Sequence, residues 1–572
     1  MEGYEIMTQD WRARRPALFL DRDGTLIEDE GYTVRVEDLR WLPGAIEAIR
    51  HANKMGALVF VVTNQSGIAR GLYSEADMRA FHAHMLAQLA EHGARIDAFY
   101  HCPYHPDGTV ARLAHADHPD RKPAPGMLRR ALTEFPVDPA RSVMIGDKDL
   151  DVEAGVRAGV RSVKVAPGAL LDAVRHELAA AIARNSRAAP DGIAQAAREA
   201  RAWLFDTAFP FWWTTGFDRR TGCFHEQIAR TGAPVAMPRR VRVQARQTFV
   251  YARAGRLGWD GPWREAVEAG LGVLLERGLN PDGGTRHLLS NDGVPIDDRR
   301  DLYDLAFVLL ALAEGGAALG GHAPAFAAAN RLVEWLDANW VHPEGGYREG
   351  EIDPSLPRRQ NPHMHLLEAL LALHAATDED AHLHRAQRLG TLARERLYRP
   401  DHCALPEYFA DDLGPFPGET GEVIEPGHQF EWCYLLGELA ERSGAVDPVA
   451  EALRATGEIY GVDHATGMVH EEVYLDGRSR KTSSRLWTHT ERLKASLKRF
   501  ARTGDPAASA AACQAFEMMM SYRLPENPAL WSERRTAEGG FVDQAVPASS
   551  LYHITFALSE LIAAGERLDG DA

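Results

Sequence analysis

Hydrophobic and polar residues follow two different patterns along the chain, and the pattern changes near residue 190. Before this point, short apolar runs alternate with longer amphipathic stretches. The apolar runs predict buried strands at residues 17–20, 57–62, 96–100, 142–146 and 161–165. Because strands that alternate with helices are typical of a parallel, helix-covered sheet, we expect an α/β domain here.

From about residue 193 onward, apolar residues recur at helical spacing in about a dozen segments. Similar short sequence motifs that contain glycine, called glycine words below, lie between pairs of these segments. They stand at residues 221–225, 282–286, 344–348, 466–470 and 538–542. The first three words recur at about sixty residues, close to the length of two helices with their loops. This repeat predicts an all-α domain in which helical hairpins close into an (α/α)6 barrel, with its site where the inter-helix loops gather.

The two patterns predict two domains, at residues 14–170 and 193–566. A chain of 572 residues is too long for a single core, which agrees with this division. The segment between the domains, residues 171–192, ends in Asn, Ser, Pro and Gly residues that are typical of turns. We expect it to be a linker.

The composition and net charge of the chain exclude several classes of protein function. Hydrophobic residues make up 45% and charged residues 25%, as in ordinary globular proteins. The net charge of -17 argues against nucleic acid or an anionic membrane as a partner. No apolar run is long enough to span a bilayer, no signal peptide is visible, and the five scattered cysteines fit a reducing compartment. We therefore expect a cytoplasmic protein and leave its oligomeric state open.

Candidate chemistry begins where the first strand ends. Asp21 and Asp23 follow the apolar run directly, and Gly24 lets the backbone turn sharply. Chemistry in an open α/β sheet lies outside the carboxyl ends of the strands. Asp21 is suited to be a nucleophile that forms an aspartyl-phosphate, and Asp23 to protonate the leaving oxygen and then activate water.

Further polar residues follow the other strands and suit a phosphoryl group. Thr63 and Asn64 offer hydrogen-bond donors, and Lys122 offers a fixed positive charge. Magnesium prefers oxygen ligands. We therefore predict a Mg²⁺ site formed by Asp21, Asp23 and Asp147, in which one of the ligands is a backbone carbonyl. Asp151 is expected to support this site.

These motifs stand in a specific order, at residues 21–25, 63–71, 121–127 and 146–151. In this order they resemble the D-glycero-D-manno-heptose 1,7-bisphosphate phosphatase family of the haloacid dehalogenase superfamily. The resemblance implies a Rossmann-like haloacid dehalogenase fold and a Mg²⁺-dependent phosphatase that removes the C7 phosphate of that sugar or a related one. It also implies that Arg70, Arg121 and Lys148 meet the substrate or its phosphate.

The loop before the Arg121 motif departs from this family. The family carries a zinc loop of Cys-x-His followed by Cys-x-Cys, whereas this chain has Tyr104 at the first histidine and lacks both later cysteines. Thiolate and imidazole both suit zinc. One expectation is a structural Cys-His₃ zinc site, and the other is a metal-free loop. The candidate ligands are Cys102, His105, His115 and His118.

The helical part carries histidines at helix starts, several with a carboxylate nearby. His365 and Glu368, like His428 and Glu431, are three residues apart and share a helix face. Interconverting an aldose and a ketose moves a proton between neighbouring carbons, and histidine titrates in the range that this chemistry needs.

The sequence motifs around these histidines resemble those of the N-acylglucosamine 2-epimerase superfamily. This superfamily includes mannose and sulfoquinovose isomerases and mannose-6-phosphate isomerase-like proteins. The resemblance implies that His428 and His553 are the acid/base pair and that Arg246 polarises the carbonyl oxygen. It implies no metal or other cofactor for the barrel. The residues that would bind the sugar or open its ring are His365, Glu431, Trp432, His489 and Glu491.

We therefore expect a bifunctional enzyme, a sugar-phosphate phosphatase fused to an aldose-ketose isomerase of mannose or mannose 6-phosphate type. The alternatives for the barrel are a sugar 2-epimerase and a catalytically inactive carbohydrate-binding or oligomerisation module. A glycoside hydrolase needs two opposed carboxylates, which the histidine-led words disfavour. The expected partners are small sugar phosphates. Arg239, Arg240 and Arg242 favour a phosphosugar in the barrel but are equally compatible with surface charges.

Overall fold

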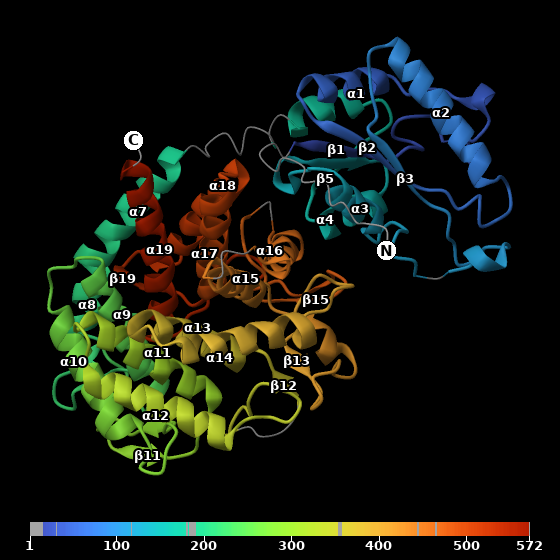
Figure 1. Ribbon diagram of the computed structural model, residues 1–572. Helices are drawn as coiled ribbons and strands as arrows, with labels where there is room; N and C mark the ends of the chain where they lie inside the picture. Colours follow the sequence, from blue (N-terminus) through green and yellow to red (C-terminus); the bar gives the residue numbers. More distant parts are fainter. Residues whose placement is uncertain are drawn as a thin grey trace. The chain divides into compact units, whose positions relative to one another are not determined.

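The computed structural model describes residues 15–570 apart from residues 30, 116, 179–180, 182–189, 353–356, 443–445 and 464–465. The chain divides into two compact units (Figure 1). The first contains the described residues up to residue 181, and the second takes nearly all of the described chain from Pro190 onward. Each unit has its own architecture.

The first domain is built on a five-stranded parallel sheet with the order β3-β2-β1-β4-β5. β1 is central, and its Leu20 pairs with Val61 of β2 and Ile145 of β4. The three strands therefore reach the same edge of the sheet together. The strands are β1 (Ala17–Leu20), β2 (Leu58–Asn64), β3 (Ala98–Cys102), β4 (Val143–Gly146) and β5 (Arg161–Lys164).

Both faces of this sheet are covered by helices, because successive side chains of a strand point to opposite faces. Leu18 and Leu20 join a core with α1 (Ala45–Lys54) and α2 (Glu75–Glu91). Ala17 and Phe19 join a second core with α3 (Gly126–Glu134) and α4 (Asp149–Arg157). The predicted parallel α/β fold is confirmed.

The start of the expected linker packs with the first domain. A short helix, α5 (Leu170–Ala173), continues into a wider turn of helix, Val174–Leu178. Leu170, Val174 and Leu178 are buried against the core that also holds α1. Residues 182–189 of the expected linker lie outside the described residues.

The second domain consists of paired helices (Figure 1). In α15, 13 of 16 residues are buried, against 5 of 13 in α14, which separates an inner from an outer set. The inner helices are α9 (Val241–Arg256), α11 (Leu302–Ala318), α13 (Asn361–Thr377), α15 (Pro426–Glu441), α17 (Leu486–Thr503) and α19 (Ser550–Gly570). The outer helices are α7 (Pro190–Trp203), α10 (Trp263–Val273), α12 (Ala323–Asn339), α14 (Asp380–Leu392), α16 (Pro448–Gly461) and α18 (Pro506–Met520).

The inner helices form a ring, and side-chain contacts link them. Lys494 of α17 lies over the rings of Tyr434 in α15 and Phe556 in α19, and Phe249 of α9 packs on Phe556. This arrangement confirms the predicted (α/α)6 barrel. In the described part of the chain, no helix is long and apolar enough to cross a membrane.

The repeated glycine words form similar tight turns. The backbone N–H of Asn280 donates to the carbonyl of Gly284, and His342 pairs with Gly346 and Thr536 with Gly540 in the same way. Gly283 has a φ of +103°, and a Cβ there would lie 2.1 Å from the ring of Trp335. The turns therefore require glycine both for conformation and for space.

Phe19 tests how far the first domain depends on its sheet core. Its side chain is fully buried, with its ring centroid 5.2 Å from that of Phe60. We expect Phe19→Ala to lower the free energy of unfolding of this domain by about 3–5 kcal/mol, because a cavity replaces the ring. Urea unfolding followed by loss of phosphatase activity would measure this. Val156→Ala, at a side chain 62% exposed on α4, should change it by less than about 0.5 kcal/mol; equal effects would contradict the prediction.

Candidate active sites

Asp21 and Lys122 form the centre of the first site. Asp21 follows β1 and is buried, and its backbone N–H donates to the carbonyl of Ile145. The Nζ of Lys122 lies 2.6 Å from Asp21 Oδ1 and 2.6 Å from Asp151 Oδ1, and it donates to the Val62 carbonyl at 2.8 Å. Burial alone would lower the pKa of Lys122, but Asp21 and Asp151 outweigh burial and raise it. Lys122 is therefore a fixed buried cation beside Asp21.

Three carboxylates converge on the same edge. Asp21, Asp147 and Asp151 each place an oxygen so that the three atoms lie within 4.8 Å of one another. Gly24 makes room, because a Cβ there would lie 2.5 Å from Asp147 Oδ2, and its φ is +86°. This all-oxygen donor set fits the expected Mg²⁺.

Asp23 is bound by two neighbouring side chains and is not part of the Asp21, Asp147 and Asp151 group. Arg22 donates to Asp23 Oδ1 from Nε at 3.0 Å and from Nη2 at 2.9 Å, and Gln65 Nε2 donates to Oδ2 at 3.0 Å. Burial, followed by the charge of Asp21, raises the pKa of Asp23 although Arg22 acts in the opposite direction. A raised pKa suits a carboxyl that must carry a proton.

The two residues at the end of β2 hold other groups of the site. Thr63 Oγ1 accepts a hydrogen bond from Gln65 Nε2 at 2.8 Å. The Asn64 amide binds the Lys122 backbone in both directions, at 3.1 Å to its carbonyl and 3.0 Å from its N–H. Asn64 thus fixes the backbone that presents the buried lysine.

In the second domain His428 stands at the start of α15 among carboxylates. Its Nδ1 lies 2.9 Å from Glu407 Oε2 and 3.7 Å from Glu425 Oε2, and its Nε2 lies 3.1 Å from the amide nitrogen of Asn361. Burial alone would lower the pKa of His428, but Glu407 and then Glu425 outweigh it and raise the pKa to about 10. The raised pKa favours the cationic form of this imidazole, in which Nε2 carries a hydrogen and the Asn361 amide must turn its oxygen toward it.

His553 of α19 has the opposite character. Its Nδ1 lies 3.0 Å from Glu491 Oε1. Burial lowers the pKa of His553 to about 4 although Glu491 acts in the opposite direction. The Trp487 ring lies between the two imidazoles, with centroids 5.0 Å from His428 and 5.7 Å from His553. The barrel therefore pairs a charged with a neutral histidine around one indole.

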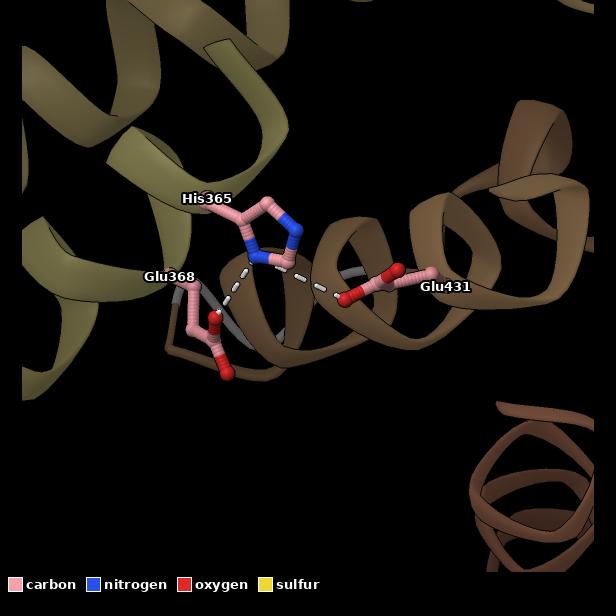
Figure 2. Close-up of side chains that lie close together, drawn as sticks. All are labelled: His365, Glu368 and Glu431. Carbon is pink, nitrogen blue, oxygen red and sulfur yellow. Dashed lines mark hydrogen bonds and ion pairs between the residues drawn. The ribbon is translucent and has the colours of Figure 1, made fainter. Parts of the chain in front are cut away.

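His365, Glu368 and Glu431 form a buried cluster beside this pair (Figure 2). His365 Nδ1 lies 3.2 Å from Glu368 Oε2 and 3.7 Å from Glu431 Oε1, and its ring centroid lies 6.5 Å from that of His553. Burial, followed by the charge of Glu491, raises the pKa of Glu431 well above its ordinary value. Glu431 therefore favours its protonated form.

Arg246 of α9 faces the same cluster. Its Nη2 donates to the Tyr303 hydroxyl at 2.8 Å, and its guanidinium carbon lies 3.9 Å from the ring centroid of Phe307. Both His365 and His553 experience its charge, which lowers their pKa values after the larger effect of burial. The cation is thus placed next to the histidine pair.

Comparison with known proteins agrees with the two domains. The model of the N-acylglucosamine 2-epimerase family matches residues 222–557, and a HAD-hydrolase-like model matches residues 120–198. A mannose-6-phosphate isomerase of Rhizobium meliloti is 39% identical over 381 residues, 64% of this chain and 96% of the relative. A D-glycero-beta-D-manno-heptose-1,7-bisphosphate 7-phosphatase of Rhodopseudomonas palustris is 49% identical over 148 residues, 26% of this chain and 81% of the relative.

The chain belongs to the N-acylglucosamine 2-epimerase family and, in its first domain, to the heptose-bisphosphate phosphatase family. It is a hydrolase joined to a sugar isomerase or epimerase. The solved cellobiose 2-epimerase of Spirochaeta thermophila has a TM-score of 0.59 at 23% identity, over 66% of this chain and 98% of that one. At this identity the likeness shows the barrel fold alone.

Two residues predicted to bind the sugar in the epimerase-family barrel are fully buried and hydrogen-bonded to protein groups. Trp432 is fully buried, and its ring N–H donates to Gln360. His489 is also fully buried, and its Nε2 lies 3.0 Å from the Ser484 hydroxyl. Both side chains are enclosed by protein atoms, and their assignment as sugar-binding residues stays a prediction. Trp487 is the indole beside the histidines.

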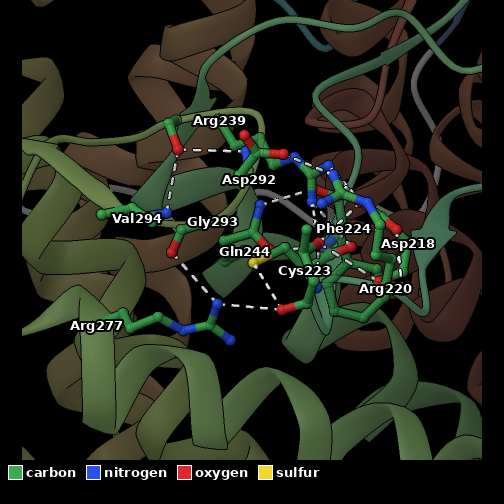
Figure 3. Close-up of polar contacts among 12 residues, drawn as sticks. Asp218, Arg220, Cys223, Phe224, Arg239, Gln244, Arg277, Asp292, Gly293 and Val294 are labelled. Atoms are coloured by element: carbon green, nitrogen blue, oxygen red, sulfur yellow. Dashed lines mark hydrogen bonds and ion pairs between the residues drawn. The ribbon is translucent and has the colours of Figure 1, made fainter.

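The three arginines expected to favour a phosphosugar are paired with carboxylates. Arg239 Nη2 lies 2.7 Å from Asp218 Oδ2 (Figure 3), Arg242 Nη1 lies 2.6 Å from Asp304 Oδ1, and Arg240 pairs with Glu226. Arg239 is buried and its partner Asp218 is partly buried. These guanidinium groups stabilise the loops and helix starts around them, so they provide no argument for a phosphate group.

The phosphatase-family arginines and Lys148 have partners within the first domain. Arg121 Nη1 donates to the Tyr104 carbonyl at 3.0 Å, and Arg70 Nη2 lies 3.2 Å from His105 Nε2. Lys148 Nζ lies 3.1 Å from Asp29 Oδ2 and 3.8 Å from Asp147 Oδ2. Of these three residues, Lys148 is the one that lies next to a member of the Asp21, Asp147 and Asp151 group.

The expected zinc site is not supported. In the described part of the loop, no three of Cys102, His105, His115 and His118 place ligand atoms within 4.8 Å of one another. Burial raises the pKa of the Cys102 thiol to about 11, which disfavours the thiolate that zinc requires. The imidazole of His118 stacks on Tyr104 with centroids 3.7 Å apart. The aromatic ring of Tyr104 therefore packs on one of the candidate ligands.

Several residues of these sites were not predicted. Gln65 lies inside the 63–71 motif, which offered a signal for it. Glu407 and Glu425, which bind His428, lie before α15 in the sequence. Glu407 stands outside the helices and strands, so no helical or strand periodicity marks it. Lys494 was also missed, although it lies three residues after Glu491 on the same helix face.

Gly24→Ala tests the geometry of the phosphatase site. The added Cβ would push Asp147 away, so we expect phosphate release to fall by about a hundredfold or more. Gly31→Ala is a matched control, because Gly31 has a similar φ of +81° but nothing within 4 Å of its Cβ position. Steady-state phosphate release by both variants would measure the difference. Equal losses would mean that backbone strain, rather than the displaced carboxylate, is responsible.

Proposed function

We propose that the first domain is a Mg²⁺-dependent phosphatase that acts through an aspartyl-phosphate on Asp21. The substrate class is a sugar phosphate, with D-glycero-D-manno-heptose 1,7-bisphosphate and its C7 phosphate as the first candidate, as the name of the Rhodopseudomonas relative supports. The observation that carries the proposal is the buried Lys122 next to Asp21 and the carboxylate group at the same sheet edge.

In this mechanism each residue has a separate task. The Asp21 carboxylate attacks phosphorus while Lys122 offsets negative charge on the phosphoryl oxygens. Asp23 gives a proton to the leaving sugar oxygen and later removes one from the water that hydrolyses the intermediate. Mg²⁺ held by Asp21 and Asp147, with Asp151 in support, would supply positive charge for the phosphate.

Asp21→Asn is the direct test of this proposal. The amide is a poor nucleophile and a weaker ligand, so phosphate release from sugar bisphosphates should fall by about a thousandfold or more. Conversion of aldose to ketose by the same variant should stay at the wild-type level, since the barrel contains its own acid/base groups. Phosphate release at the wild-type rate would contradict the nucleophile assignment.

For the barrel we propose an aldose-ketose isomerase of the mannose or mannose 6-phosphate type. The Rhizobium relative's name supports this substrate class. The observation that carries it is the pair of imidazoles with opposite charge states, each bound through Nδ1 to a carboxylate. Groups whose environments push their pKa values apart are the usual acid and base of such a site.

The reaction follows from these charge states. Neutral His553, with Nδ1 bound to Glu491, accepts the proton from the carbon next to the carbonyl through Nε2. Arg246 stabilises negative charge on the enediolate oxygen. Cationic His428 donates a proton to the neighbouring carbon while the hydroxyl proton on the C2 oxygen passes to the C1 oxygen, which completes the ketose. Proton exchange with water then returns both imidazoles to their starting states. A 2-epimerase is the second candidate, because two imidazoles on different helices can also return a proton to the same carbon from its other side.

The pH profile of isomerisation tests the two roles. We expect kcat/KM to fall below the His553 pKa of about 4, where the base is protonated, and above the His428 pKa of about 10, where the acid has lost its proton. Glu407→Gln removes the largest charge that raises the pKa of His428, so the alkaline limb should move to lower pH. The acid limb should stay in place.

Solvent exchange separates the remaining alternatives. Wild-type protein with mannose, fructose, glucose or their 6-phosphates in D₂O should incorporate deuterium at C2, and the product identifies an isomerase or a 2-epimerase. If none of these sugars exchanges, the barrel is a binding module and the isomerase proposal fails.

A further inference from the structure

Lys494 is a buried cation for which the proposed reaction has no direct use. It lies on α17, one turn after Glu491, and its side chain is 1% exposed. Its Nζ lies 2.7 Å from Glu491 Oε2, and it lies over the rings of Phe556 and Tyr434, 4.2 and 5.0 Å from their centroids. A buried lysine in apolar surroundings needs a reason, because its desolvation costs several kcal/mol unless a partner offsets it.

Glu491 joins this cation to the proposed base. Its Oε2 meets Lys494, while its Oε1 lies 3.0 Å from His553 Nδ1 and accepts a hydrogen bond from the Thr490 hydroxyl at 3.1 Å. The three side chains form a chain of cation, carboxylate and imidazole. Burial alone would raise the pKa of Glu491, but Lys494 and then His553 outweigh burial and lower it to about 2.

Other charged groups face this chain from every neighbouring helix. Glu431 of α15 and Glu368 of α13 both act on Lys494, and Arg246 of α9 and His365 of α13 act on His553. The Tyr552 hydroxyl of α19 is bound to Glu368. Lys494 therefore stands among three buried carboxylates, but Glu491 is the one with which it forms an ion pair shorter than 3 Å.

Without this cation the carboxylate would have a different role. A protonated Glu491 would donate its hydrogen to Nδ1 of His553. The imidazole would then carry its own hydrogen on Nε2, the atom that must accept the substrate proton. An ionised Glu491 instead accepts from Nδ1–H and leaves Nε2 bare.

We propose that Lys494 is a positioning residue for isomerisation, which holds Glu491 ionised so that His553 keeps a bare Nε2. This inference rests on the proposed isomerase function of the barrel. It assigns Lys494 no contact with the sugar, because its side chain is enclosed by protein atoms.

Lys494→Met should change catalysis in a specific way. Loss of the cation lets the Glu491–His553 pair bind a proton more readily, so the acid limb of kcat/KM should move up by about one pH unit or more. Near the wild-type acid limb kcat should fall by up to about tenfold, because the base is protonated in a larger fraction of molecules, while KM stays within about threefold. Lys494→Arg should restore the acid limb. Lys498→Met, one turn further along α17 and paired with Glu438 and Glu441, is the matched control and should keep the wild-type profile.

A double-mutant cycle guards against a merely structural effect. If Lys494 acts through Glu491, then Lys494→Met should cause little further loss of kcat in a Glu491→Gln background. An additive loss, or a wild-type acid limb in Lys494→Met, would overturn the inference. Absence of C2 exchange in the wild-type protein would instead overturn the proposed function, so the two failures are distinguishable.

Discussion

The ion pairs of Lys122 with Asp21 and Asp151 determine how the phosphatase edge is built. A cation that is almost fully buried is stable only if carboxylates face it, and here two of them lie at 2.6 Å. The same two carboxylates contribute to the group that would hold Mg²⁺. The lysine therefore lets three acidic side chains approach one another at a single sheet edge. Asn64 maintains this arrangement by binding the backbone of Lys122 on both sides.

The barrel solves a related problem with helices instead of strands. Its inner helices bring Glu368, Glu431 and Glu491 into a buried region, and Lys494 and Arg246 provide positive charge there. In the first domain one cation lies among the carboxylates of a strand edge, where it serves the nucleophile. In the barrel the charges are spread over several helices, so each histidine has its own electrostatic environment. Both sites thus depend on desolvated charges whose partners are set by the fold.

Much of this could be predicted from the sequence, because β1, β2 and β4 end at residues that form the phosphatase site. Asp21, Thr63 and Asp147 follow apolar runs, and parallel strands bring such positions to one edge. The His365–Glu368 pair followed likewise from helical spacing. The side of an inner helix that faces the site could not be predicted. The inner helices are buried all round, so the apolar pattern of α15 does not distinguish Trp432, which is in the core, from His428. Glu407 reaches His428 from a loop, through tertiary contacts that leave no local signal.

The opposite charge states of the two histidines follow from how many carboxylates each one faces and from the cations that act on them. His428 meets both Glu407 and Glu425, whose charges together outweigh burial and raise its pKa. His553 meets only Glu491 at hydrogen-bond distance, and Lys494 already balances that carboxylate. Arg246 adds a second cation on the His553 side. One imidazole is therefore an acid and the other a base before any sugar binds. The difference arises from the charged groups around the carboxylates that bind each imidazole, rather than from the histidines themselves.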